Sequence, residues 1–430
     1  MRDPTGEPLE LEIRDLTVRG EGIGSLPDGR TVFVPNAVPG DRARVRVVEE
    51  KARFARGELL GLARPSAERR DPRCSLFGRC GGCQLQHLRY QSQVEWKARR
   101  IGESLRRIGG LEVQDPPVEP SPLEWGYRNR MSFTLRRLGR GRIVAGLHRA
   151  GLPGRIVSVS DECVLPESPV LQVWTALRAA WGPGAELLPP GRELRLTLRR
   201  ALDGAALVVE GGRPGGSAEQ LMERVPGLVS VAHRPTGGSL LHLAGPSSTK
   251  DRWFGEEVPV SSGAFLQVNR ELGEVLQRAV LGEMGNPSGL RVVDAYCGVG
   301  AFGRRLARHG AAVVGIELDG DAVDAARTEA PKGLEILHGR VEALLPAALP
   351  ADRVILNPPR QGLDPSVPVL LRERQVPRIV YVSCDPATLA RDLARLGARY
   401  RVRSLRGYDL FPQTTHVETV VVLDHVSPTG

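Results

Sequence analysis

Short Val- and Ile-rich runs alternate with helical segments from about Val258 to the end of the chain, and no other feature constrains the fold as strongly. The expected strands span residues 291–296, 311–317, 334–339, 353–357, 378–383 and 417–423. Apolar strands separated by helices are typical of a parallel, doubly wound sheet covered on both faces. Ligands of such sheets bind beyond the carboxyl ends of the strands. We therefore expect an α/β domain over residues 256–430.

Two further parts precede this domain. Residues 1–65 alternate apolar and polar positions with period two, and turns at Asp28-Gly29 and Pro39-Gly40 predict a small barrel of about five strands. Such barrels often bind RNA, although a purely structural barrel is an equal alternative. Residues 66–255 hold a cysteine-rich loop, an amphipathic helix over 91–108, a proline-rich break and then further strands. They predict a central α+β domain.

Four of the six cysteines form one candidate metal site. Cys74, Cys80 and Cys83 have the spacing C-x5-C-x2-C in a Gly-rich loop, and Cys163 follows at a distance. Four thiolates can hold an iron-sulfur cluster or a structural zinc ion. The spacing favours the cluster because zinc sites usually use paired C-x2-C units and only one such unit is present. The absence of any metal stays an alternative.

The charge of the chain points to a polyanionic partner. Lys and Arg number 59 against 50 Asp and Glu, a net charge of +9 that arginine almost entirely carries. A basic proteome is the alternative explanation. The segment GYRNRMSFTLRRLGRGR contains six arginines and predicts either an RNA phosphate track or a solvated edge strand. The first residues hold no apolar signal region and no run of about eighteen apolar residues occurs, so we expect a cytoplasmic protein that does not insert into membranes.

A glycine-rich turn follows the first strand of the α/β domain. Gly298, Gly300 and Gly303 give G-x-G-x-x-G, and Glu317 follows nineteen residues after Gly298 at the end of the next strand. This pattern predicts a nucleoside cofactor whose ribose binds Glu317. S-adenosylmethionine is favoured over NAD because Asp294 in the approach to the turn would repel a diphosphate and the turn contains no cation.

Cys384 follows the strand 379–383 directly and precedes a helix with Asp385 at its N-cap and Pro386 in its first turn. A thiol at this corner lies at the ligand edge of the sheet, where a helix N-terminus favours the thiolate. We expect a nucleophile there, with a buried structural cysteine as the alternative. Cys297, inside the glycine-rich turn, is expected to serve packing only.

Two polar residues stand at other strand ends. Asn357 ends a strand in the motif NPPRQGL and is either presented to a substrate base or part of a strand-terminating turn. Glu418 lies at the entry to the last apolar strand, where it is either solvent-facing or a base held near the site.

The chain resembles the uracil-C5 RNA methyltransferases, which make 5-methyluridine in 23S rRNA and tRNA, nearly from end to end. The resemblance rests on the N-terminal barrel, the four cysteines, and the motifs GYRNRM, AFLQVN, DAYCGVGAFG, NPPRQGL, SCDPATLARDL and DLFPQTTHVE. It implies a TRAM-like barrel at 1–65, a 4Fe-4S cluster on the cysteines at 66–255, and a Rossmann-like S-adenosylmethionine-dependent methyltransferase domain at 256–430.

The resemblance also implies the roles of single residues. Gln267, Tyr296, Gly298, Gly300, Glu317 and Asn357 would bind S-adenosylmethionine. Cys384 would add to C6 of the target uracil, which makes C5 nucleophilic, and Glu418 would remove the C5 proton. The chain departs from the family pattern at Asn357, where Asp is common, and at Ala301, where a small polar residue such as Asn is common. Both departures bear on cofactor or base orientation and neither on the covalent chemistry.

The RNA partner and two rival functions stay open. The cysteines and the barrel together favour 23S rRNA over tRNA, and no obligate protein partner is evident. Asn-Pro-Pro also marks enzymes that methylate exocyclic amino groups of nucleic acids, although Arg360 follows here instead of an aromatic residue. A non-catalytic RNA-binding cluster protein is the third reading.

Overall fold

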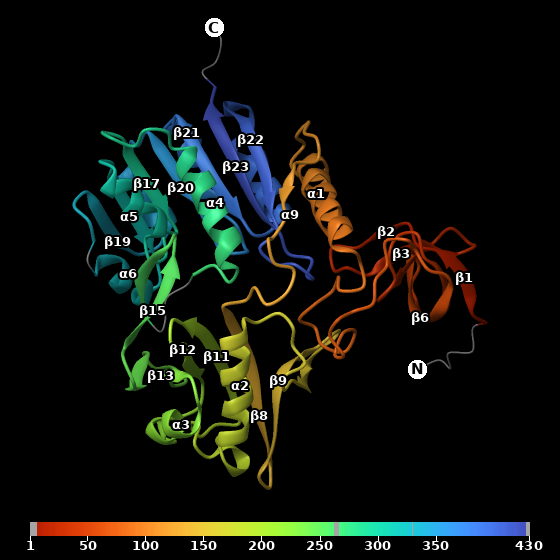
Figure 1. Cartoon of the computed structure of the whole chain (residues 1–430). Coiled ribbons are helices and arrows are strands. Elements are labelled where there is room, and N and C mark those ends of the chain that lie inside the picture. Colours follow the sequence, from red (N-terminus) through yellow and green to blue (C-terminus); the bar gives the residue numbers. More distant parts are fainter. Residues whose placement is uncertain (1–6, 262–265, 329, 427–430) are drawn as a thin grey trace.

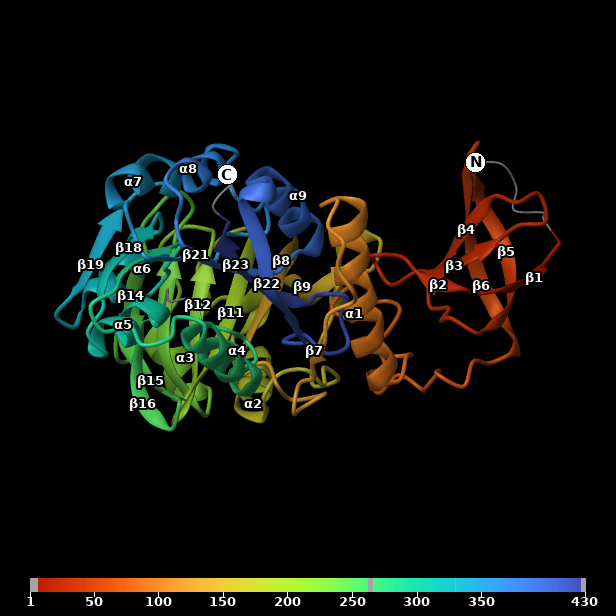
Figure 2. The same ribbon diagram turned by 90° about the horizontal axis from the view of Figure 1, so that it is seen from above.

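The N-terminal part of the chain forms one six-stranded sheet, seen at the right of Figure 2. The structure is a computed structural model and describes residues 7–261, 266–328 and 330–426. The strands are β1 Leu9–Glu12, β2 Asp15–Leu16, β3 Gly22–Ser25, β4 Thr31–Val34, β5 Arg42–Glu50 and β6 Phe54–Arg64, in the order β1-β5-β6-β4-β3-β2. Alternate residues such as Val32, Val34 and Val45 fill its core. The period-two pattern therefore predicted this part well, with six strands in place of about five.

Helix α1 Tyr90–Arg107 lies between this sheet and the rest of the molecule (Figure 2). It matches the predicted helix over 91–108. The proline-rich break after it contributes a strand that the sequence did not predict, β7 Val118–Glu119, which pairs in parallel with β22 Tyr400–Tyr408. The helix packs on the C-terminal domain, because Ile101 and Leu105 belong to a core that also contains Leu389 and Leu393.

The central part is a seven-stranded sheet with helices α2 and α3 against it (Figure 1). Its elements are β8 Arg130–Gly139, β9 Arg142–Arg149, β10 Leu152–Ser158, α2 Ser168–Ala180, the 3-10 turn Pro183–Ala185, β11 Glu193–Ala201, β12 Gly204–Glu210, α3 Ala218–Arg224, β13 Leu228–Arg234 and β14 Leu241–Ala244. The order is β10-β9-β8-β11-β12-β13-β14. The prediction of an edge strand for the arginine-rich segment is wrong, because β8 lies between β9 and β11.

Two strands outside this sheet, β15 Ser248–Trp253 and β16 Glu256–Ser261, form a hairpin. The hairpin spans the expected boundary between residues 255 and 256. The domain limits 1–65, 66–255 and 256–430 therefore stay predictions.

The C-terminal part is an eight-stranded sheet in the order β19-β18-β17-β20-β21-β23-β22-β7. Its further elements are α4 Arg270–Gly282, β17 Arg291–Ala295, α5 Ala301–Arg308, β18 Ala312–Glu317, α6 Gly320–Arg327, β19 Leu334–His338, α7 Val341–Ala348, β20 Arg353–Leu356, α8 Ser366–Glu373, β21 Arg378–Ser383, α9 Pro386–Leu396, the 3-10 turn Gly397–Arg399 and β23 Glu418–His425. Every predicted strand is present.

This sheet is covered on both faces, as the alternation predicted. Val292 packs with α4 and α5, whereas its neighbour Val293 packs with α8 and α9. Strands β17 to β21 are parallel. The last strand is not: β23 runs antiparallel to both β21 and β22, because a hairpin-like return from β22 brings it back along the sheet. None of the described helices is long and apolar enough to cross a membrane.

Candidate active site

The corner between β21 and α9 holds Cys384 as the sequence predicted. Strand β21 ends at Ser383, and the Asp385 carboxylate caps α9 by accepting from the backbone N–H groups of Ala387 and Thr388 at 2.9 and 3.0 Å. Cys384 is partly exposed at this corner. Burial and the nearby Glu418 nevertheless raise the pKa of its thiol to about 11. Burial and the Glu418 charge therefore outweigh the helix N-terminus in setting the pKa of this thiol.

Glu418 lies directly beside this cysteine. Ser383 pairs with Thr419 across the antiparallel strands β21 and β23, so the next residues of the two strands, Cys384 and Glu418, meet at the same sheet edge. The Glu418 side chain is buried, and burial raises its pKa to about 7. Of the two alternatives for Glu418, a solvent-facing carboxylate is therefore wrong, and the structure brings together two groups that lie 34 positions apart in the chain.

Arg360 is a third charged group at this edge. Its exposed guanidinium lowers the pKa of both Cys384 and Glu418 by its positive charge, so it lies near both. Its Nη2 lies 3.2 Å from Nε2 of His416, and burial followed by the charge of Arg360 lowers the pKa of His416 to about 4. His416 is therefore neutral near pH 7. Sequence reasoning noticed Arg360 only as the residue after the two prolines.

The glycine-rich turn forms at the neighbouring strand ends. Tyr296, Gly298 and Gly300 all have positive φ, and a Cβ placed on Gly298 would meet no atom within 4 Å. One oxygen of the Glu317 carboxylate accepts from the Gly298 backbone N–H at 2.9 Å, and the other accepts from the backbone N–H groups of Leu318 and Asp319. Glu317 thus stands at the end of β18 beside open space over the turn, as the spacing predicted.

Asp294 has a different role from the one expected. It is fully buried, and its Oδ2 accepts from the Gly303 backbone N–H at 3.0 Å in the first turn of α5. Burial raises the pKa of this carboxyl to about 7. Because it faces the α5 backbone and not the ligand edge, the argument from repulsion of a diphosphate is wrong. Cys297 is buried in a small apolar cluster with Val323 and Ala326, which confirms its packing role.

Asn357 and Gln267 lie in different places. Asn357 follows β20, and its backbone N–H donates to the Ala295 carbonyl at 3.2 Å, so it stands beside Tyr296 at the ligand edge. Gln267 precedes α4, and its carbonyl accepts from Nδ2 of Asn129 in the central part. In the described part of the chain no hydrogen bond joins Gln267 to the glycine turn. Ala264 and Phe265 of the AFLQVN motif lie outside the described residues.

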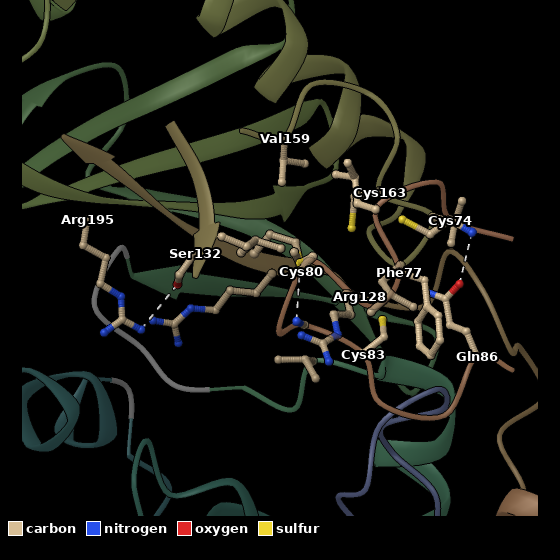
Figure 3. A pocket seen from close by; sticks show the side chains of 18 residues that line it. Cys74, Phe77, Cys80, Cys83, Gln86, Arg128, Ser132, Val159, Cys163 and Arg195 are labelled. Carbon is tan, nitrogen blue, oxygen red and sulfur yellow. Dashed lines mark hydrogen bonds between the residues drawn. The ribbon is translucent and has the colours of Figure 1, made fainter. Parts of the chain in front are cut away.

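The four predicted ligand cysteines line one cavity of about 460 Å³, together with Arg128 (Figure 3). None of the six cysteines forms a disulfide. Burial raises the pKa of Cys83 to about 12 and that of Cys163 to about 11. Over residues 7–261, 266–328 and 330–426, no group of three or more Cys, His, Asp or Glu side chains is arranged to hold a metal ion. The iron-sulfur prediction is therefore not confirmed.

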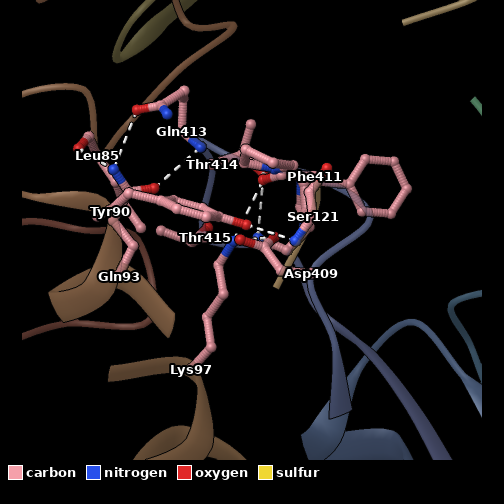
Figure 4. A network of polar contacts seen from close by, with 12 residues as sticks. Leu85, Tyr90, Gln93, Lys97, Ser121, Asp409, Phe411, Gln413, Thr414 and Thr415 are labelled. Atoms are coloured by element: carbon pink, nitrogen blue, oxygen red, sulfur yellow. Dashed lines mark hydrogen bonds and ion pairs between the residues drawn. The ribbon is translucent and has the colours of Figure 1, made fainter. Parts of the chain in front are cut away.

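A buried polar network holds the segment that leads to Glu418 (Figure 4). Nζ of Lys97 on α1 lies 2.5 Å from Oδ1 of Asp409, and both side chains are fully buried. Gln93, one turn earlier on α1, donates to the Gln413 side chain and accepts from the Gln413 backbone N–H. The Gln413 carbonyl accepts from the backbone N–H of Leu85, two residues after Cys83. Helix α1 and the cysteine loop therefore fix residues 409–415, a contact the sequence did not predict.

Comparisons with known proteins bear on this arrangement. A TRAM domain model matches residues 4–60, and a tRNA (uracil-5-)-methyltransferase model matches residues 340–426. An uncharacterized RNA methyltransferase of Gloeobacter violaceus is 36% identical, over 97% of this chain and 97% of its own length. Another from Synechocystis sp. is 34% identical, over 98% and 96%. The chain belongs to the RNA uracil-C5 methyltransferase family.

A solved member of this RNA methyltransferase family has the same overall fold. The crystal structure of Pyrococcus abyssi tRNA (uracil-54, C5)-methyltransferase, in complex with S-adenosyl-L-homocysteine, aligns with a TM-score of 0.75 and 26% identity. The alignment covers 96% of this chain and all of that chain. The methyltransferase fold with an N-terminal TRAM domain, expected from the sequence, is thereby confirmed, and the chain is an RNA methyltransferase.

Proposed function

We propose that this enzyme transfers a methyl group from S-adenosylmethionine to C5 of a uridine in RNA, with Cys384 as nucleophile and Glu418 as base. The observation that carries the proposal is the meeting of these two side chains at the ends of β21 and β23. A thiol alone would suit many reactions. A thiol beside a buried carboxyl whose pKa is about 7 suits a reaction in which a nucleophile adds to one carbon and a base then removes a proton from the neighbouring carbon.

Uracil C5 is too weak a nucleophile to take a methyl group directly. Cys384 loses its thiol proton to solvent, and its sulfur adds to C6, which converts the ring into an enolate. C5 then attacks the methyl carbon of the sulfonium, the bond between that carbon and sulfur breaks, and S-adenosylhomocysteine leaves. The Glu418 carboxylate removes the C5 proton, the electron pair of that bond restores the C5–C6 double bond, and the Cys384 thiolate leaves. Because the ring edge is shielded by stacking in a helix, the target base is flipped out or unpaired.

The turn beyond β17 fits a nucleoside methyl donor. Gly298 leaves open space where a side chain would otherwise stand, and the Glu317 carboxylate borders it. We assign Tyr296, Gly298, Gly300, Glu317 and Asn357 to the cofactor pocket, together with Gln267. The sulfonium cofactor supplies an electrophilic methyl group, and these residues orient it toward the Cys384 edge of the sheet. Asn357 offers a carbonyl acceptor where a carboxylate is common, so we expect weaker orientation and intact covalent chemistry.

The cysteine cavity fits a 4Fe-4S cluster by its donors and its charge. Four thiols border one space, and the Arg128 guanidinium lies close enough to lower the pKa of Cys80, Cys83 and Cys163 by its charge. A cubane cluster takes four thiolates, which is the number of cysteines that border this space. Visible absorbance and iron content of anaerobically purified protein, lost in Cys74→Ala, test this assignment.

Two RNA substrates remain in contention. The cysteines and the barrel favour 23S rRNA by resemblance. The similarity to an archaeal enzyme that modifies uridine 54 of tRNA favours tRNA. We propose 23S rRNA first. Mass spectrometry of both RNAs from a deletion strain decides the question, because only the substrate loses a 5-methyluridine.

A transcript carrying 5-fluorouridine tests the mechanism. Fluorine at C5 cannot leave as a proton does, so after methyl transfer the covalent protein-RNA adduct accumulates on a denaturing gel. We expect an adduct with the wild type and S-adenosylmethionine, and none with Cys384→Ala. If Cys384→Ala still methylates RNA, the proposal is wrong and amino-group methylation, which needs no cysteine, takes its place.

A further inference from the structure

The cysteine cavity has a second end that carries positive charge (Figure 3). Arg130 and Ser132 on β8 and Arg195 on β11 line this end, whereas Arg128 lies beside the cysteines. The two strands are neighbours, and Ser132 stands opposite Thr197. Residues two apart on a strand share a face of the sheet. These polar residues therefore occupy one face of the central sheet.

The other face of the same strands is the hydrophobic one. Met131 and Phe133 alternate with the polar residues and pack in the core, where the Phe133 ring stacks on Trp174 of α2 with centroids 3.7 Å apart. Helix α2 thus packs on the Phe133 face of β8. Met131 of this face borders the cysteine cavity, and Arg130 and Ser132 of the opposite face line the charged end of the cavity. The sequence analysis did not make this division, because it treated the six arginines of the segment as equivalent, although the alternation from Arg130 to Phe133 carries the signal.

The arginines of that segment have separate roles. Arg137 donates five hydrogen bonds to the backbone carbonyls of residues 184, 185, 188, 189 and 191, and Arg136 pairs with Glu193. Both side chains are therefore committed to the fold. The Arg130 side chain makes no hydrogen bond or ion pair with any residue that the structure describes. Of this segment, Arg128 and Arg130 line the cavity, and Arg130 is the one at its charged end.

The charge at this end is only partly neutralised. Nη2 of Arg195 lies 3.4 Å from Oγ of Ser132, and its Nε lies 3.5 Å from a Glu210 carboxylate that also faces Arg234. Burial, and next the charge of Arg195, lower the pKa of Arg130. The guanidinium groups of Arg130 and Arg195 repel each other, and the Ser132 hydroxyl lies beside them. An anion with several oxygens could accept hydrogen bonds from all three side chains and relieve this repulsion.

We propose that Arg130, Ser132 and Arg195 bind a phosphate of the RNA backbone during methylation. This rests on the proposed function. Val268 lines the same cavity, and its carbonyl accepts from the Asn129 backbone N–H, so the subsite lies where the central sheet meets the segment that enters α4 of the methyltransferase domain. Phosphate contacts of this kind set the register of an RNA without reading its bases.

The test compares two double variants that lose the same charge. Arg130→Gln/Arg195→Gln removes the subsite. Arg142→Gln/Arg213→Gln is the control, because both side chains are exposed and make no hydrogen bond or ion pair with described residues. The probe is a fluorescein-labelled single-stranded RNA of about 20 nucleotides, with Kd measured by anisotropy from about 50 to 200 mM salt.

Each phosphate contact to a single strand contributes about 0.7 to the slope of log Kd against log salt. We expect the subsite variant to lose one to two such contributions and to bind at least about tenfold more weakly, whereas the control keeps the wild-type slope. Arg130→Lys/Arg195→Lys should keep most of the salt slope, because both positive charges remain. This variant should lose part of the affinity, because an ammonium group cannot donate two parallel hydrogen bonds to a phosphate as a guanidinium does. Equal slopes for the two glutamine variants, with equal melting temperatures, would overturn the proposal.

Two readouts separate this proposal from the function on which it rests. At saturating 5-fluorouridine RNA, the subsite variant should still form the covalent adduct, because the subsite does not touch Cys384. A wild type that forms no adduct refutes the proposed function instead. Calorimetry with inorganic phosphate is the last arm. Phosphate binding that the subsite variant loses, with RNA affinity unchanged, would assign the site to a free anion and overturn the RNA assignment.

Discussion

Replacing Lys97 by Met should destabilise the protein by an amount that depends on pH. Lys97 and Asp409 are both fully buried, and Nζ of Lys97 also donates to the Phe411 carbonyl at 3.2 Å. Burial lowers the pKa of Lys97 and raises the pKa of Asp409. The negative charge of Asp409 opposes the first shift, and the positive charge of Lys97 opposes the second. The variant leaves the Asp409 carboxylate buried without its counter-ion, which typically costs about 3–5 kcal/mol.

The structure sets an upper limit on this cost. A buried carboxyl that has lost its partner can take up a proton instead of staying charged. From an ordinary pKa of 3.8, protonation at pH 7 costs about 4 kcal/mol, at about 1.36 kcal/mol for each of 3.2 pH units. At pH 5 the same protonation costs about 1.6 kcal/mol. Because the folded-state pKa of Asp409 is raised in the variant, the variant becomes less stable as pH rises. The destabilisation caused by Lys97→Met should therefore be about 2.7 kcal/mol smaller at pH 5 than at pH 7.

Urea unfolding at the two pH values measures the effect. Lys250→Met is the control, because this exposed lysine pairs with Glu257 alone among the described residues, and its replacement should cost under about 1 kcal/mol at either pH. Lys97→Met/Asp409→Asn should recover most of the loss, since no buried charge remains. A cost for Lys97→Met equal to that of the control, or one that does not fall at pH 5, would refute this reasoning.

Four further predictions concern the site and its frame. The methylation rate at saturating RNA should rise with pH through about 7, as Glu418 ionises, and then level off, and Glu418→Gln should abolish this rise. Because burial raises the pKa of Glu418, the wild type should lose stability as pH rises from 4.5 to 7, and Glu418→Gln should not. Arg360→Gln should shift the rise in rate to above pH 7, since the positive charge of Arg360 lowers the pKa of Glu418 and Cys384 in the wild type. Glu317→Ala should weaken S-adenosylhomocysteine binding about 10–100-fold by calorimetry, as one charged hydrogen-bond acceptor is lost. Arg137→Ala should lower the melting temperature and leave the salt dependence of RNA binding unchanged, contrary to a phosphate role for every arginine of β8.

Local signals in the sequence were enough to place the candidate site. Pro386, Asp385 and the apolar strand before Cys384 each bias a few residues of backbone, and together they fix a strand-to-helix corner. Gly298 and Gly300 act in the same way, because both take a positive φ that glycine adopts without strain. The carboxyl ends of parallel strands share one edge, so the motifs that follow β17, β20 and β21 were expected to lie together. Glu418 stands at the start of β23 and reaches this edge only because that strand is antiparallel, which the sequence did not predict.

Contacts between distant residues gave no such signal. A lysine in an amphipathic helix is normally expected to be exposed. Nothing in the sequence near Lys97 indicates that this residue pairs with Asp409, which lies 312 positions later. The direction of β23 was also hidden, because an apolar run has the same composition in either direction and only β22 before it sets the return. Strand β7 consists of two residues in a proline-rich segment, too few to produce a pattern.

The pKa of Cys384 depends on such distant contacts as well, and the balance has a chemical consequence. A helix N-terminus favours a thiolate by about 0.3–1 kcal/mol at most exposed sites. Burial and Glu418 outweigh it, since a pKa of about 11 leaves only about one thiol in 10⁴ ionised at pH 7. Protonated Glu418 no longer repels a thiolate, so Cys384 ionises most easily when Glu418 carries its proton. Once the sulfur is bonded to C6 it carries no charge, and Glu418 ionises more easily. In the proposed reaction the carboxyl is therefore neutral when the nucleophile forms and charged when the C5 proton must leave.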